Sequence, residues 1–123
     1  MLMTTQLYGQ DLDNYLWKKR VVLLFEDNAN KEQIKEQLIL LRSDTKALEE
    51  RDIIIFAVKG QKAEELQEQL LLRSDFKGLA LIGKDGGVKF KGNLPVSLDT
   101  LLSLIDGMPM RRAEMRSSNK KPD

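Results

Sequence analysis

The sequence predicts an α/β fold, a three-layer sandwich in which helices cover both faces of a four-stranded mixed sheet in the order β-α-β-α-β-β-α. Three observations predict this class. Short apolar runs have the composition of buried strands, the segments between them have helical spacing of apolar residues, and a glycine-rich turn separates the last two strands. With 123 residues, 41% of them hydrophobic, the chain has the size of one compact domain.

The first two strands flank the first helix. Residues 21–25 form a short apolar run followed by polar residues, which is typical of a buried strand. Asn30 then precedes a segment with apolar residues every three or four positions, so we expect it to cap one helix over about 31–50. Residues 53–58 are rich in β-branched side chains and predict a second strand. A right-handed crossover through the helix makes the two strands parallel.

The second half of the chain predicts a helix, a hairpin and a closing helix. Residues 63–73 have helical spacing, and 79–82 and 88–91 flank a turn that contains Gly86 and Gly87. The second hairpin strand alternates apolar and charged residues, which favours the edge of the sheet. Ser97 or Asp99 begins the last helix, and Gly107 with Pro109 ends it.

These elements divide the chain into one domain over residues 1–110, with a lead-in over 1–20, and a basic polar C-terminal tail over 111–123. We expect the tail to fray. The 20 Lys and Arg residues nearly balance 19 Asp and Glu residues, so no overall field attracts nucleic acid or anionic lipid. No apolar run is long enough to span a membrane, and the N-terminus lacks the pattern of a secretory leader. We therefore expect a soluble domain that does not bind nucleic acid.

The chain contains neither cysteine nor histidine. Thiol–disulfide exchange and peroxide reduction by a thiolate are therefore excluded. The Ser-His-Asp triad and zinc sites built from Cys or His are excluded for the same reason. We expect no cofactor and no catalytic residue of these kinds.

Several segments together resemble an uncharacterised thioredoxin-like domain family that is found in short bacterial proteins and in sushi-repeat-containing extracellular-matrix proteins. The resemblance covers about residues 11–116 and rests on DLDNYLWKKR at 11–20, ERD at 50–52, LIGKDGGVK at 81–89 and IDGMPMRRAEM at 105–115. It implies a peroxiredoxin-related fold, a role in interaction, and frequent export. A periplasmic or secreted location is then favoured if a leader precedes the chain, with the cytoplasm as the alternative. Unlike thioredoxins, the chain has no Cys-x-x-Cys after Phe25, and it has Gly78 instead of a proline before the third strand.

Polar residues follow the first strand where open α/β sheets commonly bind ligands. Their oxygen atoms suit a small ligand or a hard divalent cation, and the simpler interpretation is helix capping and solvation. The candidate ligand loop consists of Glu26, Asp27, Asn28 and Asn30.

The C-terminal segment offers a candidate partner surface, because flexible thioethers beside two guanidinium groups suit an apolar surface rimmed by acidic groups. Its residues are Met108, Met110, Arg111 and Arg112. The alternative is an anchor in which the methionines pack on the sheet and the arginines pair internally.

We expect Arg51 and Asp52 to form a charged corner that pairs internally or faces water, with a ligand anchor as the alternative. We expect Tyr15 and Trp17 to form a lid packed over the sheet, with an aromatic binding edge as the alternative. The function that follows is a non-catalytic thioredoxin-like module that binds a protein partner of unspecified identity. The alternative is a small-ligand or divalent-cation-binding protein or enzyme that uses the carboxylates after the first strand.

Overall fold

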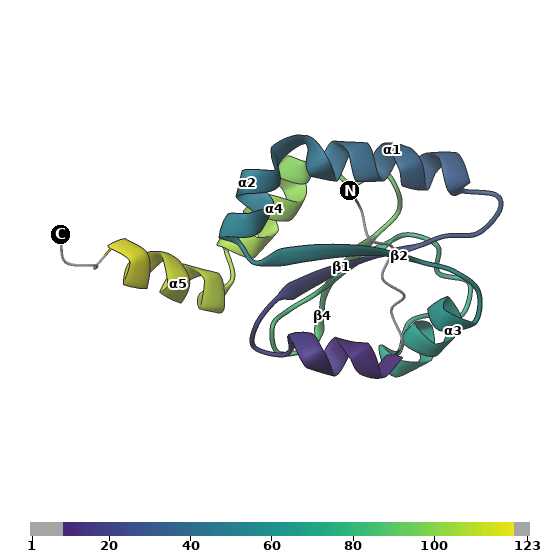
Figure 1. Ribbon diagram of the computed structural model, residues 1–123, viewed down its shortest axis with the longest axis horizontal. Helices are drawn as coiled ribbons and strands as arrows, with labels where there is room; N and C mark the ends of the chain where they lie inside the picture. The colour runs from purple at the N-terminus through teal and green to yellow at the C-terminus, as the bar shows by residue number, and fades with distance from the viewer. Residues whose placement is uncertain (1–8, 120–123) are drawn as a thin grey trace.

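The computed structural model describes residues 9–119, and it shows a mixed four-stranded sheet between two layers of helices (Figure 1). The strands are β1 (Arg20–Phe25), β2 (Ile53–Val58), β3 (Leu79–Ile82) and β4 (Val88–Gly92), in the order β2-β1-β3-β4. β1 pairs parallel with β2 and antiparallel with β3, and β3 pairs antiparallel with β4. The predicted α/β class with a four-stranded mixed sheet is confirmed.

Helices cover both faces of the sheet. The layer above it in Figure 1 holds α1 (Lys31–Leu41), α2 (Thr45–Glu50) and α4 (Leu98–Asp106). The opposite face is covered by the 3₁₀ helix η1 (Gly9–Tyr15) and by α3 (Gly60–Gln69). None of the described helices combines the length and hydrophobicity that crossing a membrane requires.

The central strand β1 is buried along its whole length and packs against both helical layers. Val21, Leu23 and Phe25 join the core beneath α3, whereas Val22 and Leu24 join the core beneath α1 and α4. A strand buried on both faces needs apolar side chains at successive positions, not at alternating ones. This explains why the sequence of β1 contains a continuous apolar run.

A buried glutamine joins α1 to the segment that precedes α4. The side-chain amide of Gln37 donates to the carbonyl of Val96 at 2.8 Å and accepts from the Val96 N–H at 2.7 Å. Both groups are inaccessible to water, so this pair of bonds satisfies a backbone donor and acceptor within the core.

The expected helix over 31–50 is interrupted. A 3₁₀ turn, η2 (Arg42–Asp44), separates α1 from α2, and the Asp44 side chain caps α2 by accepting from the N–H of Ala47 at 3.1 Å. The expected cap at Asn30 is also wrong, since its side chain makes no capping bond to α1. Ser97 does cap α4, accepting from the N–H of Thr100 at 3.1 Å.

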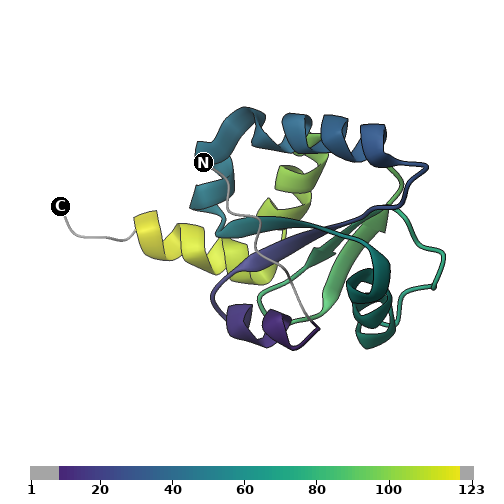
Figure 2. The ribbon, with the colours of Figure 1, turned by 45° about the vertical axis from the view of Figure 1, so that its right-hand side comes forward.

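The expected frayed tail is wrong over 111–119, because α5 (Pro109–Asn119) continues the chain as a helix after the corner at Gly107. α5 projects away from the sheet and its covering helices (Figure 2). Residues 120–123 of the expected tail, like residues 1–8 of the lead-in, lie outside the described part of the chain. The physical reason for the helix lies in ion pairs to distant segments, which are described below.

Candidate functional site

The loop after β1 is held by its own polar groups. Asp27 Oδ1 accepts from the N–H groups of Ala29 and Asn30, both at 2.9 Å. The Asn30 side chain accepts from the N–H of Asp27 at 2.8 Å and donates to the carbonyl of Phe25 at 3.0 Å. The side-chain oxygens of Asp27 and Asn30 therefore fix the shape of the loop. Glu26 is half-buried and Asn28 is exposed.

This loop contains no cysteine that could act as a thiol nucleophile. In the described part of the chain, no three side chains of His, Cys, Asp or Glu come together in a way that could hold a metal ion. The predicted loop residues do lie together, but their arrangement is that of a closed turn.

Gly78 borders this loop from the next segment of chain. Its carbonyl accepts from the N–H of Phe25 at 3.0 Å, and the neighbouring Lys77 carbonyl accepts from the Asn30 side chain at 3.2 Å. A Cβ atom at Gly78 would run into the carbonyl oxygen of Gly92. Only glycine fits at this position, which explains why no proline precedes β3.

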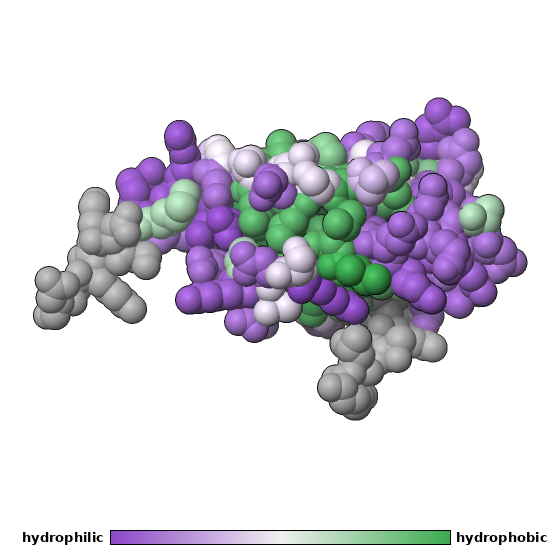
Figure 3. All heavy atoms as spheres, turned by 90° about the horizontal axis from the view of Figure 1, so that it is seen from above, coloured by the Kyte–Doolittle hydropathy of each residue, from purple (hydrophilic) through white to green (hydrophobic). Residues whose placement is uncertain are grey.

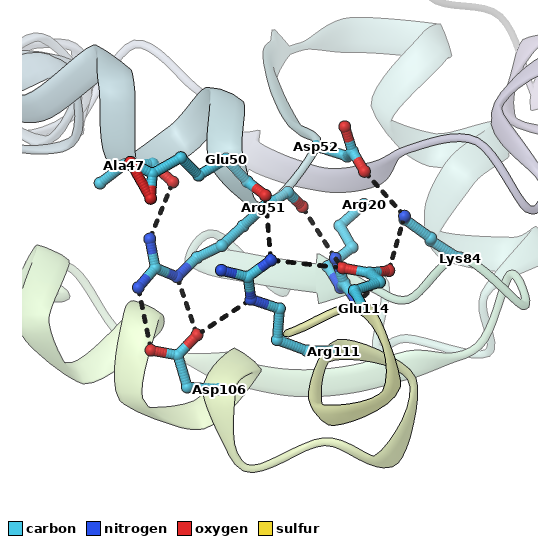
Figure 4. Close-up of polar contacts among 9 residues, drawn as sticks. All are labelled: Arg20, Ala47, Glu50, Arg51, Asp52, Lys84, Asp106, Arg111 and Glu114. Carbon is cyan, nitrogen blue, oxygen red and sulfur yellow. Dashed lines mark hydrogen bonds and ion pairs between the residues drawn. The ribbon is translucent and has the colours of Figure 1, made fainter. Parts of the chain in front are cut away.

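Seven charged side chains gather at the opposite end of the sheet, where β1 and β2 begin (Figure 4). They come from β1, from the corner before β2, from the turn after β3, from the end of α4 and from α5. We call this group the basal ionic cluster, and its residues are Arg20, Arg51, Asp52, Lys84, Asp106, Arg111 and Glu114.

The inner part of the cluster centres on the carboxylate of Glu114. Arg20, only 1% exposed, donates to both of its oxygens, at 3.3 Å from Nη1 and 3.2 Å from Nη2. Lys84, 8% exposed, donates to Glu114 Oε2 at 2.7 Å and to Asp52 at 2.8 Å. Arg20 also donates to the carbonyl of Arg51 at 2.8 Å. Two buried cations are thus paired with two carboxylates, as buried charges require.

The outer part of the cluster joins α2, α4 and α5. Arg51 donates two hydrogen bonds of 2.9 Å to the Asp106 carboxylate, one from Nε and one from Nη2. Arg111 donates to Asp106 at 3.4 Å and to the carbonyl of Glu50 at 3.0 Å, and it lies 3.5 Å from Glu114. Arg51 and Asp52 thus both pair within the fold, Arg51 with Asp106 and Asp52 with Lys84, as expected for a charged corner.

The pairing shifts the acid–base equilibria of the cluster. Hydrogen bonds from Arg51 hold the pKa of Asp106 below its ordinary value, and those to Asp106 raise the pKa of Arg51. Burial raises the pKa of Glu114, but hydrogen bonds from Lys84 and Arg20 outweigh it and leave that pKa lowered. Burial likewise opposes the charge on Lys84, and bonds to Asp52 and Glu114 still leave its pKa raised.

Acid is therefore expected to destabilise the domain through this cluster. Glu114 and Asp106 have lowered pKa values in the folded state, so the unfolded chain binds protons first as the pH falls below their ordinary values of 4.5 and 3.8. Their contribution is present above those values and is lost as the pH falls through the folded-state pKa values. Urea unfolding at about pH 7 and about pH 3 measures the loss.

The matched control for this prediction is the double variant Glu114→Gln with Asp106→Asn. It lacks both titrating groups, so its free energy of unfolding should fall less between the two pH values than that of the wild type. An equal fall in both proteins would contradict the assignment.

The candidate partner surface divides between two environments. Met108 is half-buried and packs against the core beneath α1 and α4, and Arg111 belongs to the basal ionic cluster. Met110 and Arg112 are exposed at the start of α5.

Of the two residues of the expected aromatic lid, one packs against the core and the other is exposed. Tyr15 packs against Phe56 with ring centres 5.8 Å apart, whereas Trp17 is 67% exposed.

Sequence reasoning did not single out Arg20, Lys84 or Glu114. Each is a charged residue inside a segment that carries the family resemblance. That position was the available signal, but the ion pairs of Glu114 with Lys84 and Arg20 join residues 30 and 94 positions apart in the sequence.

The comparisons with known proteins agree with this fold. The structure of a reduced 2-Cys peroxiredoxin from Plasmodium vivax is similar, with a TM-score of 0.61, 17% sequence identity and coverage of 88% of this chain and 90% of that chain. At this identity the likeness shows the fold alone, and it confirms the thioredoxin-like prediction. No curated protein matches the sequence. A family model described as a domain of unknown function (DUF4174) matches residues 11–114, from η1 to the central carboxylate of the basal ionic cluster. The chain therefore belongs to the DUF4174 family.

Proposed function

We propose that this domain is a non-catalytic protein-interaction module whose partner binds the helical layer formed by α1, α4 and the start of α5. The observation that carries the proposal is the placement of exposed apolar side chains. Four of the six large ones in the described part of the chain lie on these helices, and the other two are Trp17 and Leu71. We call the four the helical apolar surface: Ile39, Leu40, Leu104 and Met110.

The surroundings of this surface also favour a partner. Figure 3 looks onto the face covered by α1, α2 and α4, and it shows hydrophobic residues gathered near the middle with hydrophilic residues around them. A shallow depression beside Leu104 is lined by Asp99, Thr100 and Ser103, which place hydrogen-bonding groups next to the apolar side chain. An apolar patch rimmed by polar groups is typical of interaction sites.

Two residues of the predicted partner surface contribute to the same proposal. Met110 supplies a flexible apolar contact at the start of α5, and the exposed guanidinium of Arg112 is available to an acidic group on a partner. The resemblance to domains that accompany sushi repeats, together with the absence of thiol and imidazole groups, further favours a protein partner over a substrate.

Site-specific photo-crosslinking tests the proposal. A benzophenone side chain at position 104 is expected to crosslink a protein partner when the full chain is exposed to extract from its native source. The matched control carries the same group at position 71, where Leu71 is 91% exposed but lies outside the helical apolar surface. Crosslinking from position 104 and not from position 71 supports the proposal, and equal yields from both positions contradict it.

A substitution experiment gives the size of the effect. Replacing Ile39 and Leu104 with lysine is expected to weaken binding of the crosslinked partner about tenfold or more, because charged groups are costly within an apolar contact. The free energy of unfolding should change by about 0.5 kcal/mol or less, since both side chains are exposed. Unchanged affinity in a folded double variant would exclude this surface.

A further inference from the structure

We propose that Arg20 and Lys84 form a carboxylate-binding cradle, that Glu114 fills it as an internal ligand carried on α5, and that a carboxylate from another molecule takes the place of Glu114 when α5 moves away. The proposal assigns a binding site at the base of the sheet, apart from the helical apolar surface.

The cradle is held by contacts that do not involve α5. Arg20 is fixed by the carbonyl of Arg51 at 2.8 Å, and Lys84 is fixed by Asp52 at 2.8 Å. The backbone of Lys84 is held as well, because its carbonyl accepts from the N–H of Trp17 at 2.7 Å. Both cations therefore keep their positions when Glu114 leaves.

The two positive charges of the cradle need a second anion beside Asp52 to balance them. Asp52 balances only one of the two cations, and both cations are almost completely buried. Departure of Glu114 without a replacement leaves a buried positive charge uncompensated, which is strongly unfavourable. A carboxylate from any source removes that cost by restoring the same pairs.

The geometry selects a planar group with two oxygens. The two terminal nitrogens of Arg20 each face a different oxygen of Glu114, at 3.3 and 3.2 Å, and Lys84 adds a third bond at 2.7 Å to one of them. Parallel bonds from a guanidinium fork to a carboxylate are both strong and specific.

α5 is attached to the rest of the domain mainly by polar contacts, so another carboxylate can take the place of Glu114. No described side chain of α5 is fully buried, and ion pairs of Arg111 and Glu114 tie the helix to the rest of the domain. The rest of the helix projects away from the domain (Figures 1 and 2). A helix attached by ion pairs more than by apolar burial can leave when an equivalent carboxylate compensates the cradle.

Chemical rescue of the full-length variant Glu114→Ala tests the proposal. Sodium acetate is expected to raise the melting temperature of this variant in a saturable manner, whereas sodium chloride at equal ionic strength is not. Emission from Trp17, the chain's single tryptophan, should change over the same range, because its backbone is bonded to Lys84. The wild type should show neither effect, and adding Lys84→Met to the variant should weaken the rescue.

A second arm identifies the source of the carboxylate. A peptide with the sequence of residues 109–119 is expected to bind the variant about tenfold more tightly than the same peptide with glutamine in place of its glutamate, as a charge-assisted bond predicts. Rescue by acetate alone assigns a small carboxylate as the ligand, and binding of the peptide assigns an acidic polypeptide. If Glu114→Ala does not fold, the isosteric Glu114→Gln chain is tested with the same peptides.

Three results overturn the proposal. The first is an equal response to acetate and chloride together with equal affinity for the two peptides. The second is a rescue that persists in full when Lys84 is replaced. The third is an equal rescue by inorganic phosphate, which would show that the cradle does not select carboxylates.

Discussion

Replacement of Arg20 with alanine is expected to lower the free energy of unfolding by about 3–5 kcal/mol. The side chain is 1% exposed, so its removal leaves a cavity at the start of β1. It also removes both bonds to Glu114 and leaves the carbonyl of Arg51 without its donor. Urea unfolding followed by far-ultraviolet circular dichroism measures the loss.

The control for this prediction is Arg112→Ala, which removes the same kind of side chain from an exposed position on α5. Its effect should stay within about 0.5 kcal/mol. A loss below about 1 kcal/mol for Arg20→Ala would mean that the basal ionic cluster contributes little to stability, as exposed ion pairs do.

Replacement of Gln37 with alanine is expected to cost about 2–4 kcal/mol, because it leaves both the N–H and the carbonyl of Val96 without partners in the core. The loss should appear as a lower denaturation midpoint with an unchanged slope. Gln33→Ala is the matched control, since Gln33 lies exposed on the same helix and should change stability by about 0.5 kcal/mol or less. Similar midpoints for the two variants would contradict the role assigned to the buried amide.

The strands could be predicted because their apolar residues follow one another or alternate along short segments. β1 is apolar from Val21 to Phe25 and β2 is apolar along its whole length, and the turn that contains Gly86 separates β3 from β4. The break between α1 and α2 was missed because the apolar spacing continues across it. Only the geometry of the chain shows that Asp44 begins a new helix there by bonding to Ala47.

α5 and the basal ionic cluster could not be predicted for a related reason. A polar segment such as 111–119 looks like a tail when its stabilising partners are distant in sequence. Glu114 meets Lys84 across 30 positions and Arg20 across 94. The absence of thiol and imidazole chemistry, in contrast, was evident at once because it depends on composition alone. The candidate loop at 26–30 could be named from the sequence, but the hydrogen bonds that Asp27 and Asn30 make within it are evident only in the folded structure.

The crowding of Gly78 against Gly92 bears on any attempt to convert this domain into an oxidoreductase. Two cysteines introduced at positions 27 and 30, which have Cys-x-x-Cys spacing, would supply sulfur but would remove the Asp27 and Asn30 bonds that shape the turn. The ring of a proline beside them would still have no space, since even one added carbon at Gly78 collides with the adjoining strand. Placing a proline before β3 would therefore require β3 and β4 to separate where they meet, so the backbone resists that part of the conversion.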